Sequence, residues 1–181
     1  MILKTSLAVA ATIALSACAT NMSAPMYSQA ALPDAVKVPA GNKVAMETVG
    51  VGEITYECRA KKDMAGQFEW VFVGPDAKLM DRAGKQVGRY YGPPATWESM
   101  DGSKFTGAQV AVAPAPGTGN IPLQLVKANP ATGTGAMQGV TFVQRVATMG
   151  GVAPAAACAA GNVGAKQIVK YQSDYILYKA G

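Results

Sequence analysis

Two short segments of the chain, separated by a Gly-Pro-Pro turn, combine aromatic rings with charged groups. Arg89 and Tyr91 precede the turn, and Trp97, Glu98 and Asp101 follow it. Aromatic faces beside a guanidinium and a carboxylate can hold a sugar or a peptide, because the rings stack and the charged groups fix the orientation. These five residues form the candidate ligand-binding site, with the Tyr and Trp rings as platforms. The alternative is that the aromatic rings pack in the core while the carboxylates serve a turn.

The two carboxylates of this group also raise the question of catalysis. Glu98 and Asp101 lie three positions apart in the sequence. A pair of carboxylates about 5–9 Å apart is the machinery of glycoside hydrolysis. An enzyme acting on cell-wall glycans or peptides, with these residues as acid and base, is therefore the alternative to a binding protein. Spacing along a hairpin does not set that separation, so we assign no catalytic residue.

The chain contains no histidine, which removes several kinds of catalytic and metal site. Ser-His-Asp and Cys-His catalysis, histidine acid–base chemistry and histidine-ligated zinc all need an imidazole. The glycine-rich run from Gly133 to Gly139 has the spacing G-x-G-x-x-x-G, which differs from the dinucleotide-binding pattern. We therefore expect neither a cofactor nor a metal.

The N-terminus predicts export and a lipid anchor. Lys4 is followed by thirteen residues that are mainly apolar, too few to span a bilayer of ~30 Å, and the run Leu15-Ser16-Ala17-Cys18 closes this segment. That run resembles a bacterial lipobox, whose cysteine accepts acyl chains such as palmitate and anchors the protein firmly. The same residues also fit the small-residue exit of an ordinary signal peptide, which leaves an incidental cysteine as the alternative.

These features divide the chain and indicate where it works. We predict a signal peptide over residues 1–17, a lipidated Cys18 at the start of a flexible tether over 18–31, and one β domain over 32–181. Ala19 resembles the pattern sorted to the outer membrane of a Gram-negative host, so we expect the protein there, facing the periplasm. The mature chain is mildly basic, with 15 basic and 11 acidic residues that include no long basic run, so nucleic acid is not an expected partner.

Two cysteines remain once Cys18 is assigned to the lipid. Cys58 and Cys158 would lie in an exported domain, where the surroundings are oxidising and a disulfide is the expected state. Such a bond closes a loop of about 100 residues and could stabilise the fold by about 4–5 kcal/mol in the chain-entropy model. Two buried free thiols are the alternative.

The pattern along the chain favours β-strands throughout. In residues 54–59 the apolar Ile54, Tyr56 and Cys58 alternate with polar residues, which places the cysteine on the inward face. Gly74-Pro75-Asp76 and Asp101-Gly102 read as breaks between strands. We expect an all-β, single-domain antiparallel β-sandwich or partly closed barrel with long Gly/Pro/Ala-rich loops. Further strands are predicted over residues 44–49, 68–73, 78–80, 86–91, 109–113, 122–127, 140–148 and 168–178.

Many short motifs, in one order, resemble an uncharacterised exported family known as domain of unknown function 3455. The resemblance covers residues from about 32 to 178 and implies a largely β envelope domain with two recurrent cysteines, without an activity to carry over. The family pattern usually has a histidine where this chain has Tyr90, so a site that depends on that imidazole would be altered here. The segments that carry the resemblance include Val38–Lys43, Tyr56–Cys58, Trp70, Gly84–Gly88, Thr96–Glu98, Asp101–Ser103, Ile121–Pro122, Gln144–Thr148, Gly150–Pro154, Cys158 and Asp174–Tyr175.

Together these features predict a lipid-anchored cell-envelope protein with a non-enzymatic binding or structural domain. Its expected partners are the membrane, through the anchor, and an envelope glycan or protein.

Overall fold

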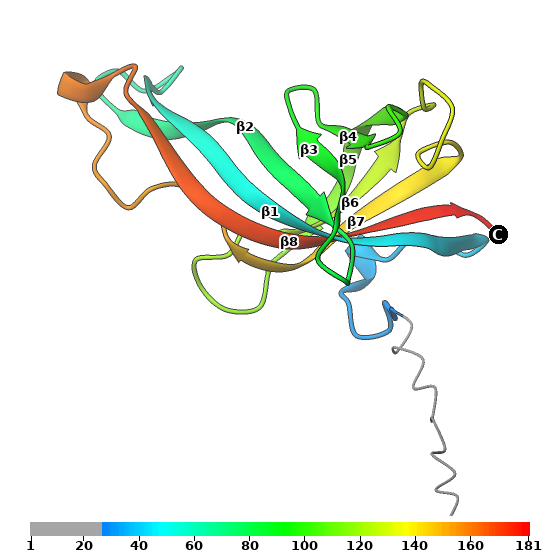
Figure 1. Cartoon of the computed structure of the whole chain (residues 1–181). Helices are drawn as coiled ribbons and strands as arrows, with labels where there is room; N and C mark the ends of the chain where they lie inside the picture. Colours follow the sequence, from blue (N-terminus) through cyan, green and yellow to red (C-terminus); the bar gives the residue numbers. More distant parts are fainter. Residues whose placement is uncertain (1–26) are drawn as a thin grey trace, which may run out of the picture.

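The computed structural model describes residues 27–181, in which one sheet of antiparallel strands dominates. Eight strands follow one another around a ring, each pairing with its neighbour in sequence, and the last pairs with the first to close the sheet (Figure 1). The expected all-β fold is confirmed, and a closed sheet replaces the sandwich alternative. The elements are η1 (Asp34–Val36), β1 (Asn42–Ala60), β2 (Phe68–Met80), β3 (Gln86–Tyr91), β4 (Thr96–Ser99), β5 (Lys104–Ala113), β6 (Leu123–Ala128), β7 (Val140–Gly150), η2 (Ala160–Asn162) and β8 (Lys166–Ala180).

Strands β1 and β2 each join segments that the sequence predicts as separate strands. The predicted strands 44–49 and 54–59 are both parts of β1, and β2 runs without interruption through Gly74-Pro75-Asp76. The predicted break at this tripeptide is wrong because the ladder with β1 continues there, with a bulge beside Tyr56. Pro75 stands just before the first β2–β3 pair, and a strand without a second neighbour tolerates proline.

Aromatic side chains fill the interior of the ring. The indole of Trp97 stacks on Tyr90, with ring centres 4.5 Å apart, and on Phe105 at 5.4 Å, and Tyr175 packs against the same group. Gly50 lies where a Cβ would overlap the ring of Tyr175, so the glycine makes room for it. An eight-stranded barrel is about wide enough for side chains to fill, and here they do so.

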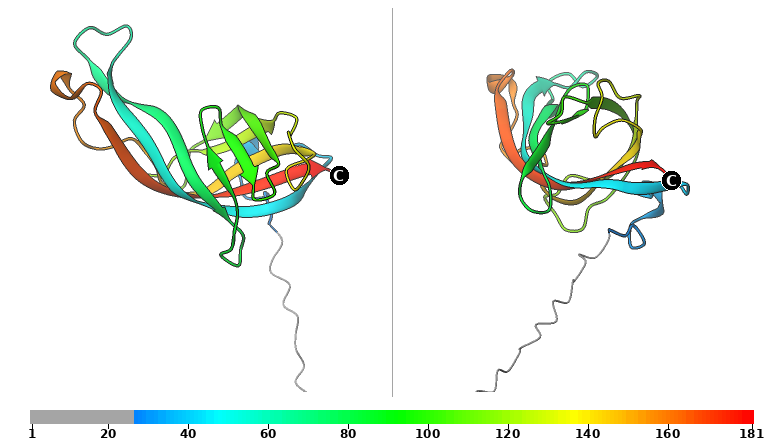
Figure 2. Two further views of the ribbon diagram at one scale, coloured as in Figure 1. Left: turned by 45° about the horizontal axis from the view of Figure 1, so that its top comes forward. Right: turned by 45° about the vertical axis from the view of Figure 1, so that its right-hand side comes forward.

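Strands β1, β2 and β8 extend well beyond the ring and form a three-stranded sheet that we call the arm (Figures 1 and 2). The segment between β7 and β8 returns along the arm and is held by the disulfide Cys58–Cys158, whose Cα atoms are 5.5 Å apart. The Trp70 indole N–H donates to the carbonyl of Ala156 at 2.7 Å, which fixes the same segment. The predicted disulfide is therefore confirmed, and the inward position predicted for the first cysteine agrees with its complete burial.

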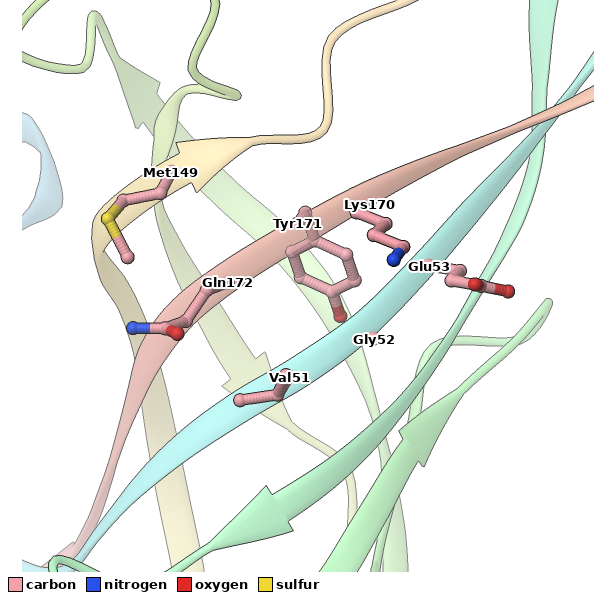
Figure 3. A pocket seen from close by; sticks show the side chains of 7 residues that line it. All are labelled: Val51, Gly52, Glu53, Met149, Lys170, Tyr171 and Gln172. Atoms are coloured by element: carbon pink, nitrogen blue, oxygen red, sulfur yellow. The ribbon is translucent and has the colours of Figure 1, made fainter.

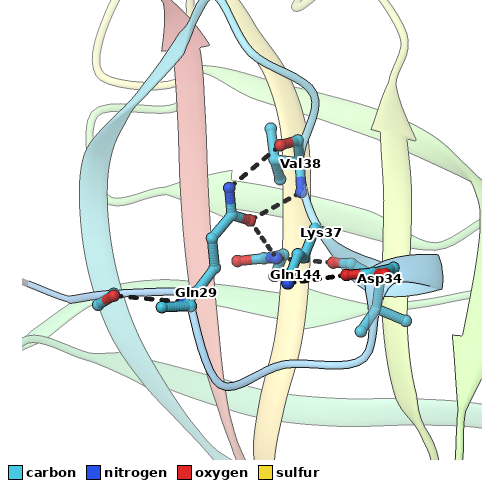
Figure 4. Close-up of polar contacts among 8 residues, drawn as sticks. Gln29, Asp34, Lys37, Val38 and Gln144 are labelled. Atoms are coloured by element: carbon cyan, nitrogen blue, oxygen red, sulfur yellow. Dashed lines mark hydrogen bonds and ion pairs between the residues drawn. The ribbon is translucent and has the colours of Figure 1, made fainter.

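Residues 27–38, which we call the strap, cover part of the outer face of the sheet. Val36 and Val38 of the strap are buried against side chains of β5, β6, β7 and β8, which makes a second apolar core outside the ring. Gln144 of β7 lies beneath the strap, and its side chain donates to Gln29 Oε1 at 2.9 Å and to the Val36 carbonyl at 2.6 Å (Figure 4). The β domain thus includes residues from Tyr27 onward, whereas the sequence assigns residues up to 31 to a flexible tether. The predicted signal peptide and Cys18 lie outside the described residues.

Candidate functional site

The five residues of the predicted site do not form one cluster, because alternation along β3 and β4 places them on opposite faces. Trp97 points into the ring and is 1% exposed, packed between Tyr90 and Phe105. It cannot serve as a surface platform for a ligand. For Trp97 the structure therefore agrees with the alternative interpretation, in which the aromatic ring packs in the core. Its indole N–H has no hydrogen-bond partner among the described residues.

Arg89, Tyr91 and Glu98 do meet, on the outer face of β3 and β4. The Glu98 carboxylate accepts hydrogen bonds from the Tyr91 hydroxyl at 2.8 Å and from the Arg89 guanidinium at 3.1 and 3.2 Å. The guanidinium also lies 4.5 Å from the centre of the Tyr91 ring. The tyrosine hydroxyl first, and the guanidinium second, hold the pKa of Glu98 below its ordinary value. This carboxyl group is therefore ionised at neutral pH. Its hydrogen bonds with Tyr91 and Arg89 already occupy one of its oxygen atoms, Oε2.

Asp101 serves a structural purpose in the turn after β4. Its carboxylate accepts bonds from the Ser103 hydroxyl and backbone N–H and from the N–H of Ala136, which lies 35 residues along the chain. These bonds, the Ser103 hydroxyl first, lower the pKa of Asp101 to about 2. They hold the loop 133–139, from which Met137 inserts as a fully buried side chain into the interior core. Within residues 27–181, Glu98 and Asp101 share no hydrogen-bond partner, and each carboxylate is bound by its own set of donors.

A different candidate site consists of two hollows that share Met149 of β7 as a lining residue. One part, about 460 Å³ in volume, runs over β1 and β8 beside Met149 (Figure 3). A second part of about 320 Å³ lies between the strap and the segment after β5, and Met149 lines it as well. We call the two parts together the Met149 groove. Its lining consists of Leu32, Val51, Gly52, Glu53, Pro116, Leu123, Ala147, Thr148, Met149, Lys170, Tyr171 and Gln172.

A bulge in β7 forms the centre of the groove. The pairs Val146–Asp174 and Met149–Gln172 leave Ala147 and Thr148 opposite a single residue of β8. Ala147 has a φ of 48°, a left-handed conformation that costs a residue with a side chain about 1–3 kcal/mol. Bulges of this kind re-aim side chains and are common beside functional sites. Here the bulge leaves Met149 53% exposed in the middle of the groove.

The two parts of the groove differ in chemistry. Around Leu32 and Leu123 the lining is apolar except for Thr148, whose hydroxyl is already used in a 2.7 Å bond to the Ile121 carbonyl. Over β1 and β8 the lining includes three polar residues, Glu53, Lys170 and Gln172. Glu53 of β1 and Lys170 of β8 stand opposite each other in the register of the two strands. The groove therefore offers apolar contact at one end and charged groups at the other. This groove was not predicted from the sequence, because its residues come from six separate segments and only the break in alternation at Ala147-Thr148 marks it locally.

Fold and site together define a closed, eight-stranded, up-and-down antiparallel β-barrel with a three-stranded arm and an apolar groove on its outer surface. The chain belongs to the family described as protein of unknown function (DUF3455), whose model matches residues 39–179. This match confirms the resemblance seen in the sequence. No curated protein and no solved structure matches the chain significantly. Within residues 27–181 there is no helix long and apolar enough to cross a membrane.

Proposed function

We propose that this protein is a lipid-anchored, non-enzymatic binding protein of the bacterial cell envelope, and that the Met149 groove holds an acyl chain of an envelope lipid. The observation that carries the proposal is the groove itself, which exposes apolar side chains around a strained bulge. Its two parts, of about 460 and 320 Å³, have the size of small-molecule sites.

The location in the envelope rests on the cysteines and the N-terminal signal. The disulfide Cys58–Cys158 is typical of an oxidising compartment such as the periplasm. The lipobox ending in Cys18 supports an anchor, and the following Ala19 supports sorting to the outer membrane. Replacement of Cys18 by serine in the full chain should move the protein from the detergent phase to the aqueous phase on phase partition. An unchanged partition would contradict the anchor.

An acyl chain suits the groove because the apolar part has no hydrogen-bonding side chain to spare. A sugar or a polar peptide would lose its bonds to water there without replacing them. The charged residues Glu53 and Lys170 at the other part suit the polar head of the same molecule. Leu32 lines the groove and follows Cys18 by 14 residues, a span of at most about 50 Å, so a lipid surface holding the anchor is within reach.

The test uses isolated envelopes that contain the full chain and a fatty acid bearing a photoreactive diazirine. After illumination we expect the label on peptides that contain Met149. Burying a half-exposed methionine contributes about 1 kcal/mol, so Met149→Glu should reduce labelling at least about fivefold. Val110→Glu is the matched control, because Val110 is 54% exposed but does not line the groove. Equal labelling at Val110, or labelling unchanged in Met149→Glu, would refute the proposal.

The enzyme alternative built on Glu98 and Asp101 is disfavoured by the hydrogen bonds that each carboxylate accepts within the protein. An acid catalyst needs a pKa raised toward the working pH, whereas the pKa values of both carboxyl groups are lowered by bonds within the protein.

A further inference from the structure

The arm has a free strand edge on β2. The β2–β3 ladder begins at Asp76, and the turn after β3 lies against Gly74. Residues 68–73 therefore pair only with β1, and no other strand of residues 27–181 lies beside them (Figure 1). Along such an edge, alternate residues present N–H and C=O groups that can pair with another strand. Natural proteins protect free edges with charges, prolines or bulges.

This edge is poorly protected over five residues, Phe68-Glu69-Trp70-Val71-Phe72. The segment has a single charge and no proline, and Phe72 is 51% exposed. The edge of β8 on the opposite side of the arm carries Lys166 and Lys170 within the same length of strand. The two edges of the arm are therefore unequal, and the β2 edge has the composition of a pairing surface.

The order of side chains in this segment is symmetric about its centre. Phe68, Trp70 and Phe72 lie on the face of the arm that continues the barrel interior, as their pairing with Ala60, Cys58 and Tyr56 of β1 indicates. Aromatic rings thus stand at equal distances on each side of Trp70. An antiparallel copy of the same segment, centred on the same residue, would place aromatic residues opposite aromatic residues.

We propose that the protein forms a twofold dimer in which the β2 edges of two copies pair antiparallel about Trp70. In this register Phe68 faces Phe72 of the second copy, and the two Trp70 residues face each other. On the other face of the arm Glu69 lies opposite Val71 of the second copy, so the two glutamates do not oppose each other. Cross-strand aromatic pairs stabilise antiparallel sheets, and the interface closes on itself because both copies use the same surface.

Cysteine cross-linking in the full chain tests the register. Glu69 and Val71 lie on the face of the arm away from the aromatic rings, where a substitution disturbs the packing least. The test uses the variants Glu69→Cys and Val71→Cys. Copies carrying one substitution, mixed with copies carrying the other, should form a disulfide-linked dimer under mild oxidation. Each variant alone should give far less, because diagonal neighbours are about 7–8 Å apart and beyond disulfide reach. The chain without either substitution gives the background from its native cysteines.

Other results would overturn the proposal. Strong cross-linking of Val71→Cys alone would mean a different register, and a cross-linked product with a mass other than twice that of the chain would mean another protein on the edge. As a second measurement, Phe72→Lys should convert the detergent-solubilised dimer to monomer in sedimentation. Ile168→Lys is the control, because this residue is 62% exposed on the opposite edge strand of the arm. Dimer loss in both variants, or in neither, would contradict pairing through β2.

Discussion

Gln144→Met should destabilise the protein and release the strap, because it removes four hydrogen bonds and keeps the size of the side chain. The amide donates to Gln29 and to the Val36 carbonyl, and its oxygen accepts from the hydroxyls of Tyr178, at 2.7 Å, and Tyr27, at 3.1 Å. The Tyr178 hydroxyl and the Val36 carbonyl belong to residues that are almost completely buried and would lose this partner. At about 1–3 kcal/mol for each such group, the expected loss is about 2–6 kcal/mol.

Thermal unfolding, followed by circular dichroism, measures this loss. For a domain of this length each kcal/mol lowers the melting temperature by about 2–4 °C, so a fall of roughly 4–24 °C is expected. Gln172→Met is the control, because the Gln172 side chain forms no hydrogen bond within residues 27–181 and should change the melting temperature little. Cleavage of the strap by a protease should also become faster in Gln144→Met alone. A change below about 2 °C, or the same change in both variants, would refute the reasoning.

Three further predictions concern the disulfide, the loop held by Asp101 and the aromatic core. Without reductant, alkylation of the unfolded protein should leave Cys58 and Cys158 unmodified in an intact-mass measurement, and replacing both by serine should cost about 4–5 kcal/mol of unfolding free energy, because the bond spans 100 residues. Asp101→Asn should destabilise the loop 133–139 at neutral pH. The pKa of Asp101 is lowered to about 2 in the folded protein, so its contribution is present above the unfolded pKa near 4 and is lost as the pH falls toward 2. Hydrogen exchange in this loop should therefore differ between variant and parent at neutral pH and converge near pH 2. Trp97→Ala should cost about 3–5 kcal/mol because the side chain is fully buried, whereas Trp97→Phe should cost less, since it removes an N–H without a partner. Chemical denaturation of the two variants measures the difference, and equal losses would contradict this account.

Local alternation was sufficient to predict which way many residues face. Ile54, Tyr56 and Cys58 were expected to point inward together, and the structure places them on the inner face of β1. The disulfide followed from the number of cysteines and the predicted export. Alternation is a property of each strand alone, so the sequence carries it in full.

The candidate site failed because proximity in the sequence was given more weight than alternation. Residues next to each other on a strand point to opposite faces, so Arg89 and Tyr91 of the predicted strand 86–91 had to lie opposite to Tyr90. Glu98 lies opposite to Trp97 in the same way on β4, a strand that was not predicted. The same alternation places the buried Trp97 on one face of the sheet and the exposed ion pair Arg89–Glu98 on the other. For the predicted strand 86–91 this part of the error could have been avoided from the sequence, whereas the placement of Glu98 and Trp97 depends on β4, which was not predicted.

The strap and the groove could not have been predicted in the same way. Gln144 occupies an outward position of β7, where alternation predicts contact with water, yet it is completely buried because the strap covers it. Its partners in the strap lie more than 100 residues earlier in the chain. The path of a segment without regular structure over a sheet depends on such long-range contacts, which no local pattern encodes. The groove beside Leu32 has the same origin, because one of its walls is the strap. Any ligand held there would contact the segment that links the barrel to the predicted anchor. Loosening the strap through Gln144→Met should therefore weaken acyl-chain labelling at Met149, which lies further along the same strand, β7.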